Sequence, residues 1–423
     1  MNQKFKGVVL SLPLLLIMGC GDLDQPKNEE VEGGEVVVDF SAPLMKKTLI
    51  GKGVADENTT VFGYKAFKIP YTTTDENGEE VEASGLFVIP TGLTPEVQQI
   101  GLSMVSDDHG TIFANNDAPS VMGENNGAPD GSAIILTAMG GFATLQADYI
   151  GFGDSNDHYH PFVQKKSLAN ATVDFIKTVK TFASDNDIKL NNQLFITGYS
   201  EGGYAAMATL QKIEAEKELT VTMAAPMAGP YDLNTTAFGV LSTPTLSVPS
   251  FMADIGYAYA KTYGKEVSDI INEPYASKLP TLLDGSLARP DIDKELTQKT
   301  TGEDGLFNPI FVGNFFKDPN NWFREAMVEN SVHAWSPQTP MRLVHCEGDK
   351  VIPFGISQIT EGTMRAMKAK DVSIVPVESF LKLDSNLSHS DCGVMAYKVT
   401  TGIFAKAREA MIKEAITAQM SGK

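Results

Sequence analysis

The sequence predicts an α/β protein with a mostly parallel, eight-stranded sheet and a helical cap inserted between the sixth and seventh strands. Two observations carry this prediction. From residue 99 onward, short apolar segments alternate with amphipathic segments of helical period, which is typical of strands joined by right-handed helical crossovers. Residues 229–339 separate two of the apolar segments by about 110 residues, whereas a bare crossover needs only about a dozen. Of the 423 residues 42% are apolar and 21% are charged, which suits a globular protein.

The first strands are expected to form the antiparallel edge of this sheet. Residues 35–40 can open the sheet, and residues 64–70 and 81–90 are its first two regular strands. Between these two, the segment Asp-Glu-Asn-Gly at 75–78 contains the Asn-Gly pair that is typical of a tight hairpin turn. Strands joined by a tight hairpin are antiparallel neighbours.

The remaining strands and their connecting helices follow in order. The strands are expected at residues 100–105, 143–150, 194–198, 221–225, 341–346 and 373–380. The helices are expected at residues 131–142, 163–184, from about Gly202, and at 394–418. The helix at 163–184 has a clear apolar face, which is made of Leu168, Val173, Ile176, Val179 and Phe182.

Segments 35–228 and 340–423 are therefore predicted to form the core, and residues 229–339 the cap. The cap is rich in large aromatic residues: Trp322, Trp335, Phe251, Phe307, Phe311, Phe315, Phe316 and Phe323. Most of them are expected to fill the interior of the cap. A few, with Trp335 and Phe316 as candidates, are expected to face the functional site and build an apolar pocket.

The N-terminus is predicted to be a targeting segment and not part of the fold. Lys4 and Lys6 precede an apolar stretch, residues 8–18, that is short for a membrane span. The stretch ends in Ile-Met-Gly-Cys at 17–20, which resembles the lipobox of bacterial lipoproteins. The resemblance implies a signal peptide at 1–19, a lipidated Cys20 and a solvated tether at 20–34. The alternative is an ordinary secretory signal with a cysteine at this position by chance.

Lipidation implies a cell-envelope protein held at the membrane through its N-terminal lipid anchor, because several acyl chains anchor a protein without a spanning helix. By resemblance, Gly21 after the cysteine suggests the outer membrane rather than the inner one, or the cell surface. The formal charge of −19 argues against a nucleic-acid partner, since phosphates require a basic surface.

A candidate nucleophile lies between the strand at 194–198 and the helix that follows it. The segment Gly-Tyr-Ser-Glu-Gly at 198–202 is a G-x-S-x-G motif, which in a strand–turn–helix context exposes the serine hydroxyl above the sheet. Ser200 is therefore the predicted nucleophile. The alternative is a glycine-rich turn that only packs a helix against a strand.

A serine nucleophile needs a base and an acid that orients the base. Of the six histidines, His389 follows the last strand and lies in the polar loop 385–391, where the order Ser…Asp/Glu…His of α/β-hydrolases places the base. His345 lies in an apolar strand and is expected to be buried with its hydrogen bonds satisfied; the other four are His109, His158, His160 and His333.

The orienting acid is expected at the end of the seventh strand, where Asp349 lies; Asp349 could instead only cap its loop, and Asp232 is its nearest rival. An oxyanion hole needs two backbone N–H groups. One is expected from Glu201, after the nucleophile, and the other from the His-Gly-Thr loop at Gly110 or Thr111.

Taken together, these motifs resemble secreted α/β-hydrolases of the secretory-lipase type over residues 60–415. The matching segments are His-Gly-Thr at 109–111, Asp-Tyr-x-Gly-x-Gly-x-Ser at 148–155, His-Pro-Phe at 160–162, Gly-Tyr-Ser-x-Gly-Gly at 198–203 and x-Gly-Asp-x-Val-x-Pro at 347–353. Two positions depart from the family pattern. Glu201 replaces the usual glutamine, which adds a carboxylate that can shift the pH optimum, and Cys346 replaces a glycine.

The resemblance implies a carboxylic-ester hydrolase, a lipase or esterase, that acts on a small-molecule ester or lipid. Ser200 would form an acyl-enzyme, His389 would act as base and then acid, and Asp349 would hold the imidazole. No metal or cofactor is required. The alternatives are a serine peptidase or aminopeptidase, or an acyltransferase, on the same fold, and a non-catalytic lipoprotein that binds an apolar ligand.

The remaining cysteines are predicted to form a disulfide. Once Cys20 is lipidated, only Cys346 and Cys392 remain, and export takes them to an oxidising compartment. Cys346 lies three residues before Asp349 and Cys392 three residues after His389. If the acid and the base meet, the two sulfurs come within bonding range. The alternative is two separate buried thiols.

Overall fold

The computed structural model describes residues 29–51, 54–126 and 131–420, and a ten-stranded sheet lies at its centre. The strands are β1 (Glu29–Val31), β2 (Gly34–Phe40), β3 (Gly63–Thr74), β4 (Glu80–Thr91), β5 (Leu102–Asp108), β6 (Ala143–Ala147), β7 (Leu190–Tyr199), β8 (Met223–Met227), β9 (Met341–His345) and β10 (Val372–Pro376). Their order is β1-β2-β3-β4-β6-β5-β7-β8-β9-β10. The pairs from β1 to β6 are antiparallel and those from β6 to β10 are parallel, so the predicted sheet type is confirmed.

The described sheet has ten strands: the eight regular strands that the sequence predicts, β2 at the residues expected to open the sheet, and β1, which was not expected. β1 pairs with β2 through a turn in which Gly33 has a φ of +78°, a value that glycine adopts without strain. Residues 29–34, which were expected to be part of the tether, therefore form β1 and its turn into β2. The predicted signal peptide and Cys20 lie outside the described residues.

The predicted hairpin is present between β3 and β4, whose register pairs Tyr64 with Pro90 and Thr74 with Glu80. Its turn is closed by Asp75, whose side chain accepts hydrogen bonds from the N–H groups of Asn77 and Glu79, both at 2.8 Å. β4 then pairs with β6, which joins the antiparallel edge to the parallel part of the sheet.

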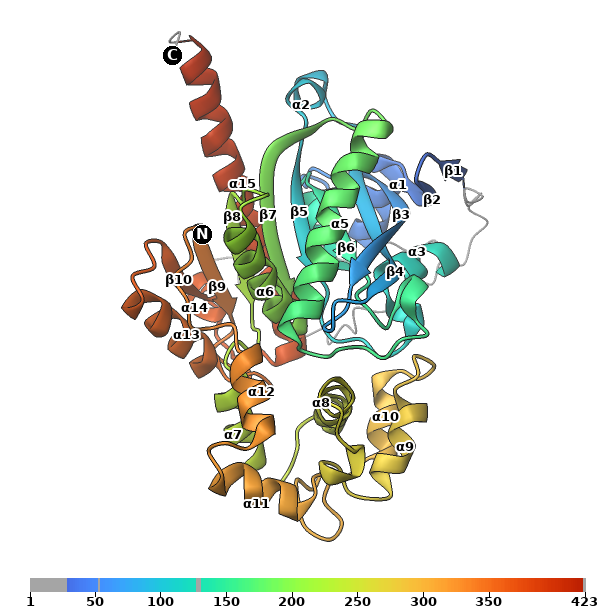
Figure 1. The fold of residues 1–423 in the computed structure, drawn as a ribbon. Helices are drawn as coiled ribbons and strands as arrows, with labels where there is room; N and C mark the ends of the chain where they lie inside the picture. The colour runs from blue at the N-terminus through green and yellow to red at the C-terminus, as the bar shows by residue number, and fades with distance from the viewer. Residues whose placement is uncertain (1–28, 52–53, 127–130, 421–423) are drawn as a thin grey trace.

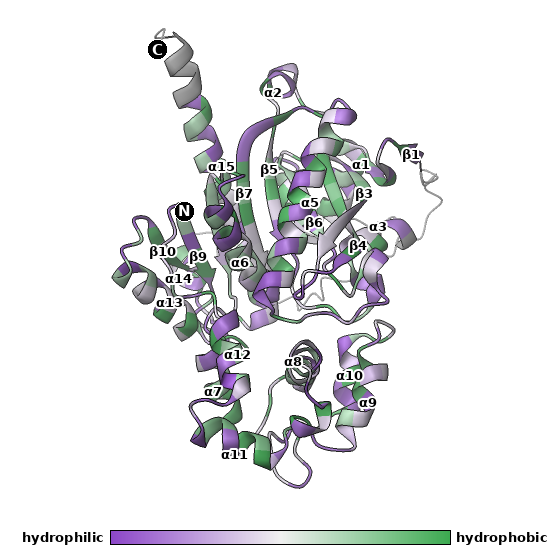
Figure 2. Ribbon diagram, in the orientation of Figure 1, coloured by the Kyte–Doolittle hydropathy of each residue, from purple (hydrophilic) through white to green (hydrophobic). Residues whose placement is uncertain are grey.

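Helices cover both faces of the sheet, as Figure 1 shows. On one face lie α5 (Lys165–Asp185) and α6 (Glu201–Glu216), and α13 (Phe354–Ala366) covers β9 and β10. The long α15 (His389–Met420) contacts β7, β8 and β9 and the π-helix η2 (Ile134–Met139). Figure 2 shows β7 hydrophilic near its start and hydrophobic in its middle, and the strand is buried from Gln193 to its end.

The remaining elements of the core are short: α1 (Ala42–Gly51), α2 (Pro95–Ile100), η1 (Asn115–Asp117), α3 (Pro119–Asn126), α4 (Gly131–Ala133), η3 (Gly153–Ser155) and α14 (Val377–Leu381). Two predicted elements differ in type over part of their length, and the others differ from the structure only in their bounds. The helix predicted at 131–142 is the short α4 followed by η2, and the strand predicted at 373–380 ends at Pro376, where α14 begins. Proline has no N–H to donate to a strand ladder, which favours a strand end there.

The insertion between β8 and β9 is helical. It contains α7 (Leu233–Leu241), α8 (Pro249–Thr262), η4 (Val267–Asp269), α9 (Tyr275–Leu282), α10 (Arg289–Glu295), α11 (Pro309–Lys317) and α12 (Trp322–Asn330). In Figure 1 these helices lie below the sheet, at the end of β7 from which α6 begins. The cap therefore covers the C-terminal ends of the parallel strands, where Ser200 follows β7. Within the described residues, no helix is both long and apolar enough to cross a membrane.

Candidate active site

Ser200 occupies the sharp turn between β7 and α6, with φ +62° and ψ −121°. A positive φ is strained for a residue with a side chain, so the surrounding packing must hold it. Two glycines make this packing possible. A Cβ at Gly202 would lie 1.8 Å from the carbonyl oxygen of Asp108 in β5, and one at Gly198 would lie 2.4 Å from the same oxygen. The turn therefore presses against β5 and pushes Ser200 outward, as the motif predicts.

The structure brings Ser200, His389 and Asp349 into one hydrogen-bonded chain. Nε2 of His389 lies 2.9 Å from Oγ of Ser200, and Nδ1 lies 2.6 Å from Oδ2 of Asp349. His389 was expected in a loop, but it is the first residue of α15. Ser388 explains this start, because its hydroxyl accepts the N–H of Asp391 at 3.2 Å in the manner of a helix N-cap.

Asp349 lies in the loop after β9, and both of its carboxylate oxygens have hydrogen-bond partners. Its Oδ1 accepts the N–H groups of Val351 at 2.9 Å and Ile352 at 3.0 Å. Burial opposes ionisation, but the hydrogen bonds from His345 and His389 outweigh it and hold the pKa of Asp349 well below its ordinary value. The carboxylate is therefore ionised, and Nδ1 of His389 donates to it.

The rival acid, Asp232, caps a helix instead of contacting His389. It is the N-cap of α7, where its side chain accepts the N–H of Thr235 at 3.0 Å, and it lies 3.7 Å from His333. His345 is fully buried, as expected, but it also contacts the acid: its Nε2 lies 3.3 Å from Oδ2 of Asp349. This second histidine on the acid was not expected from the sequence. Its position at the end of β9, four residues before Asp349, is the signal that could have found it.

The two predicted oxyanion donors lie beside Ser200. Glu201 is the first residue of α6, where backbone N–H groups have no partner within the helix. In the facing loop, Nδ1 of His109 lies 2.8 Å from the carbonyl oxygen of Gly110, which can only accept. Because a trans peptide is planar, the N–H of Thr111 points away from that carbonyl. Both predicted positions lie near the nucleophile: Thr111 lines the same pocket as Ser200 and Glu201, and a Cβ at Gly110 would lie 3.8 Å from Cβ of Ser200.

Glu201 also contributes a buried side chain. Only 2% of the residue is exposed, and its Oε1 lies 2.8 Å from Nε2 of His160. Burial lowers the pKa of His160, but the charge of Glu201 outweighs burial and the net shift is upward. Asp254, in α8 of the cap, faces the same pair, and burial raises its pKa to about 7. Neither His160 nor Asp254 was expected from the sequence to interact with Glu201.

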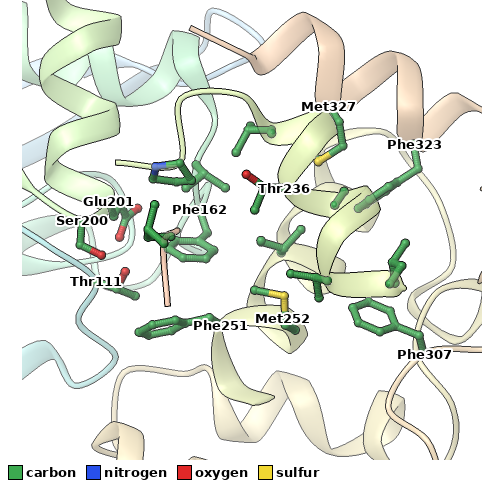
Figure 3. Close-up of a pocket in the computed structure, with 18 residues that line it drawn as sticks. Thr111, Phe162, Ser200, Glu201, Thr236, Phe251, Met252, Phe307, Phe323 and Met327 are labelled. Carbon is green, nitrogen blue, oxygen red and sulfur yellow. The ribbon is translucent and has the colours of Figure 1, made fainter. Parts of the chain in front are cut away.

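An apolar pocket runs from Ser200 into the cap and encloses about 730 Å³, including its open mouth. Figure 3 shows Ser200, Glu201 and Thr111 at one end and Phe307 and Phe323 at the other. The complete lining is Thr111, Phe162, Val163, Ser200, Glu201, Pro230, Leu233, Thr236, Ala237, Val240, Leu241, Phe251, Met252, Ile255, Phe307, Phe323, Met327 and Ile352. The expectation for Trp335 and Phe316 was wrong, because neither lines this pocket; Phe316 is 39% exposed and contacts Phe238.

The predicted disulfide between Cys346 and Cys392 is present, with the two Cα atoms 6.0 Å apart. Cys346 follows β9 and Cys392 lies in the first turn of α15. Both residues are fully buried. The bond therefore joins the loop that carries Asp349 to the helix that begins with His389.

Comparison with solved structures matches nearly the whole chain. A hydrolase from Legionella pneumophila has a TM-score of 0.77 and 24% sequence identity, over 88% of this chain and 96% of that one. The rice cell wall degrading esterase LipA from Xanthomonas oryzae has a TM-score of 0.71 and 22% identity, over 89% and 96%. The chain has the α/β-hydrolase fold. Lipase A from Candida antarctica shares this α/β-hydrolase fold more distantly, with a TM-score of 0.55 and 14% identity over 80% and 74%.

Comparisons of sequence match less of the chain. The family model described as the prolyl oligopeptidase family matches residues 130–224, which include β6, α5, β7, the Ser200 turn and α6. No curated protein matches the chain. The comparisons thus establish the fold of the chain.

Proposed function

We propose that the protein is a serine carboxylic-ester hydrolase, a lipase or esterase, that forms an acyl-enzyme on Ser200. The observation that carries the proposal is the hydrogen-bonded chain from Ser200 through His389 to Asp349 at the mouth of an apolar pocket. Since Nδ1–H of His389 donates to the carboxylate, Nε2 is free to accept the Ser200 proton. The pocket then takes the apolar acyl group of the ester.

The reaction follows from these roles. His389 removes the proton of Ser200 as Oγ attacks the ester carbonyl, and the N–H groups of Glu201 and of the His-Gly-Thr loop stabilise the negative charge on the carbonyl oxygen. His389 then gives the proton to the departing alcohol. Water, activated by the same imidazole, releases the acid from Ser200. Asp349 keeps the imidazole in the required tautomer and stabilises its charged form.

A serine peptidase is the second candidate, because the prolyl oligopeptidase family model matches the segment around Ser200. The two functions are distinguished by comparing p-nitrophenyl esters of increasing acyl length with aminoacyl p-nitroanilides. We expect ester hydrolysis that depends on chain length, and labelling of Ser200 by a fluorophosphonate. Faster turnover of the anilides than of the esters would favour the peptidase, and no labelling would exclude both.

We also propose that the chain is exported and anchored in the cell envelope through a lipid on Cys20, at the outer membrane or cell surface. The apolar segment before Cys20 supports this, and so does the disulfide, because disulfides persist in oxidising compartments. Metabolic labelling with a radioactive fatty acid should mark the wild-type chain and not Cys20→Ala. Equal labelling of both chains would contradict the anchor.

A further inference from the structure

Glu201 is the one ionisable residue among those that line the apolar pocket. Apart from it, polar side chains come only from Ser200 and the threonines 111 and 236. One carboxylate oxygen of Glu201, Oε1, contacts His160 at 2.8 Å. The other, Oε2, is shielded from solvent and has no hydrogen-bond partner among the described residues. A buried acceptor without a donor is unfavourable, and a small rotation of the Glu201 side chain toward the pocket would let a bound group supply the missing donor.

The charge of the Glu201–His160 pair follows from its hydrogen bonds. Nδ1 of His160 lies 2.8 Å from the carbonyl oxygen of Ile150, which can only accept, so Nδ1 carries a proton. One further proton then lies between Nε2 of His160 and Oε1 of Glu201. Whether it sits on the nitrogen or on the oxygen, the pair has no net charge. In both forms Oε2 is an acceptor.

We propose that the pocket selects esters whose acyl chain carries a hydroxyl group, and that Oε2 of Glu201 accepts a hydrogen bond from this hydroxyl. The inference rests on the proposed ester hydrolysis at Ser200, because Glu201 directly follows the nucleophile and lies with it at the same end of the pocket (Figure 3). The group that meets Oε2 is therefore carried by the acyl chain close to the scissile carbonyl.

A hydroxyl fits this place better than an ammonium group. Because the Glu201–His160 pair is already balanced, an ammonium would bring an uncompensated charge into an apolar pocket, and burying such a charge is costly. A hydroxyl supplies the missing donor without a charge. Asp254 in α8, which faces the Glu201–His160 pair, is also buried and adds a negative charge only when it ionises.

The test compares p-nitrophenyl esters of hydroxybutanoic and methoxybutanoic acids, substituted at carbon 2 or carbon 3. The two substituents withdraw electrons similarly, but only the hydroxyl can donate. We expect kcat/KM to favour the hydroxyl ester by about tenfold at one of the two positions, the size of one hydrogen bond to a buried acceptor. A ratio near one at both positions would overturn the proposal. The matching aminobutanoyl p-nitrophenyl esters form a third series, and a preference for them over the hydroxybutanoyl esters would also overturn it.

Two variants of Glu201 distinguish its role as a hydrogen-bond acceptor from the effect of its carboxylate charge. In Glu201→Gln the amide nitrogen can donate to His160 while the amide oxygen remains as acceptor, so the hydroxyl preference should persist. In Glu201→Met the acceptor is gone, and the ratio should fall to near one. Loss of the preference in Glu201→Gln, or its retention in Glu201→Met, would contradict the proposal. Glu216→Gln, at the far end of α6, is the matched control and should leave the ratio unchanged.

If Glu201→Met does not fold, the wild-type ratios and a crystal structure with bound 3-hydroxybutanoate decide the question. The hydroxyl should lie within hydrogen-bond distance of Oε2, and an ordered water that stays on Oε2 in the complex would overturn the inference. The outcomes also distinguish this inference from the proposed function. No turnover of any ester and no fluorophosphonate labelling would defeat both, whereas turnover with equal ratios defeats the hydroxyl selection alone.

Discussion

The hydroxyl of Tyr199 donates a hydrogen bond to the main-chain carbonyl of His389 at 2.6 Å, and the two rings lie 5.0 Å apart. The residue before the nucleophile therefore holds the backbone of the residue proposed as the base. This contact fixes His389 at the start of α15, where no preceding helical turn supports it. Tyr199 is thus a positioning residue, because it acts on catalysis only through His389.

Tyr199→Phe should lower kcat several-fold to tenfold with little change in KM, since a small displacement of a catalytic group is costly. Steady-state kinetics on p-nitrophenyl butanoate measures this. Tyr204→Phe is the control, because the Tyr204 hydroxyl also donates to a buried carbonyl, that of Asn330, at 2.7 Å but away from His389. It should lower stability and leave kcat near wild type. An equal loss of kcat in both variants would show that Tyr199 has no particular link to the base.

Ser200→Ala and His389→Ala should each abolish ester hydrolysis while the circular dichroism spectrum stays that of the wild type. Because the two residues act as a unit, the double variant should be little slower than either single variant. Near wild-type activity in His389→Ala would mean that another histidine is the base.

The assignment of the acid is checked by a matched pair of substitutions. Asp349→Asn should cost about 10⁴-fold in kcat, because the amide favours the wrong imidazole tautomer. Asp232→Asn should weaken only the N-cap of α7. A larger loss of activity in Asp232→Asn would move the acid to that position.

The parts of the molecule that follow local rules could be predicted from the sequence. The order of Ser200, Asp349 and His389 along the chain, combined with alternating strands and helices, places all three near the C-terminal ends of the parallel strands. The disulfide follows from that same meeting of loops. The β3–β4 hairpin was readable because Asn-Gly permits few other conformations.

What could not be predicted depends on contacts between segments that are distant in sequence. The pairing of His160 with Glu201 joins the loop after β6 to α6, and no periodicity reports such a contact. In the cap, composition identified the aromatic residues but not their directions, because each helix face is set by packing against other helices. Phe316 and Phe307 are alike in sequence terms, yet only Phe307 faces the pocket.

Substrate preference is expected to depend on the far end of the pocket. Phe307→Ala should enlarge the space there and shift the optimum of a p-nitrophenyl ester series toward longer acyl chains, with little effect on the acetate. Phe316→Ala is the matched control, because Phe316 lies in the same cap but does not line the pocket. Identical chain-length profiles for the two variants would show that Phe307 only fills the cap interior.

The disulfide is expected to support both stability and activity. Its removal in the double variant Cys346→Ala/Cys392→Ala should lower the free energy of unfolding by roughly 4 kcal/mol, the chain-entropy value for a closed loop of this size. Denaturant unfolding measures this. The kcat should also fall, because the bond joins the Asp349 loop to α15. Full activity with unchanged stability would show that the surrounding contacts suffice, and two alkylatable thiols in the unreduced protein would contradict the bond itself.

The buried Asp254 should make stability depend on pH. Its pKa rises from the ordinary value of 3.8 to about 7, because burial in the cap disfavours the charged form, although His160 opposes this. Between these two values the folded state keeps a proton that the unfolded state has lost. The folded state therefore loses stability as the pH rises from about 4 to about 7, and the loss levels off above that.

Asp254→Asn removes this dependence, because the amide does not ionise. Relative to wild type, the variant's free energy of unfolding should rise between pH 5 and pH 8 by up to about 3 kcal/mol, which corresponds to two pH units of proton linkage. Denaturant unfolding at both pH values measures the difference. Asp304→Asn, an exposed cap position, should show no such change. A constant difference between Asp254→Asn and wild type would mean that Asp254 is already ionised at pH 5 in the folded protein.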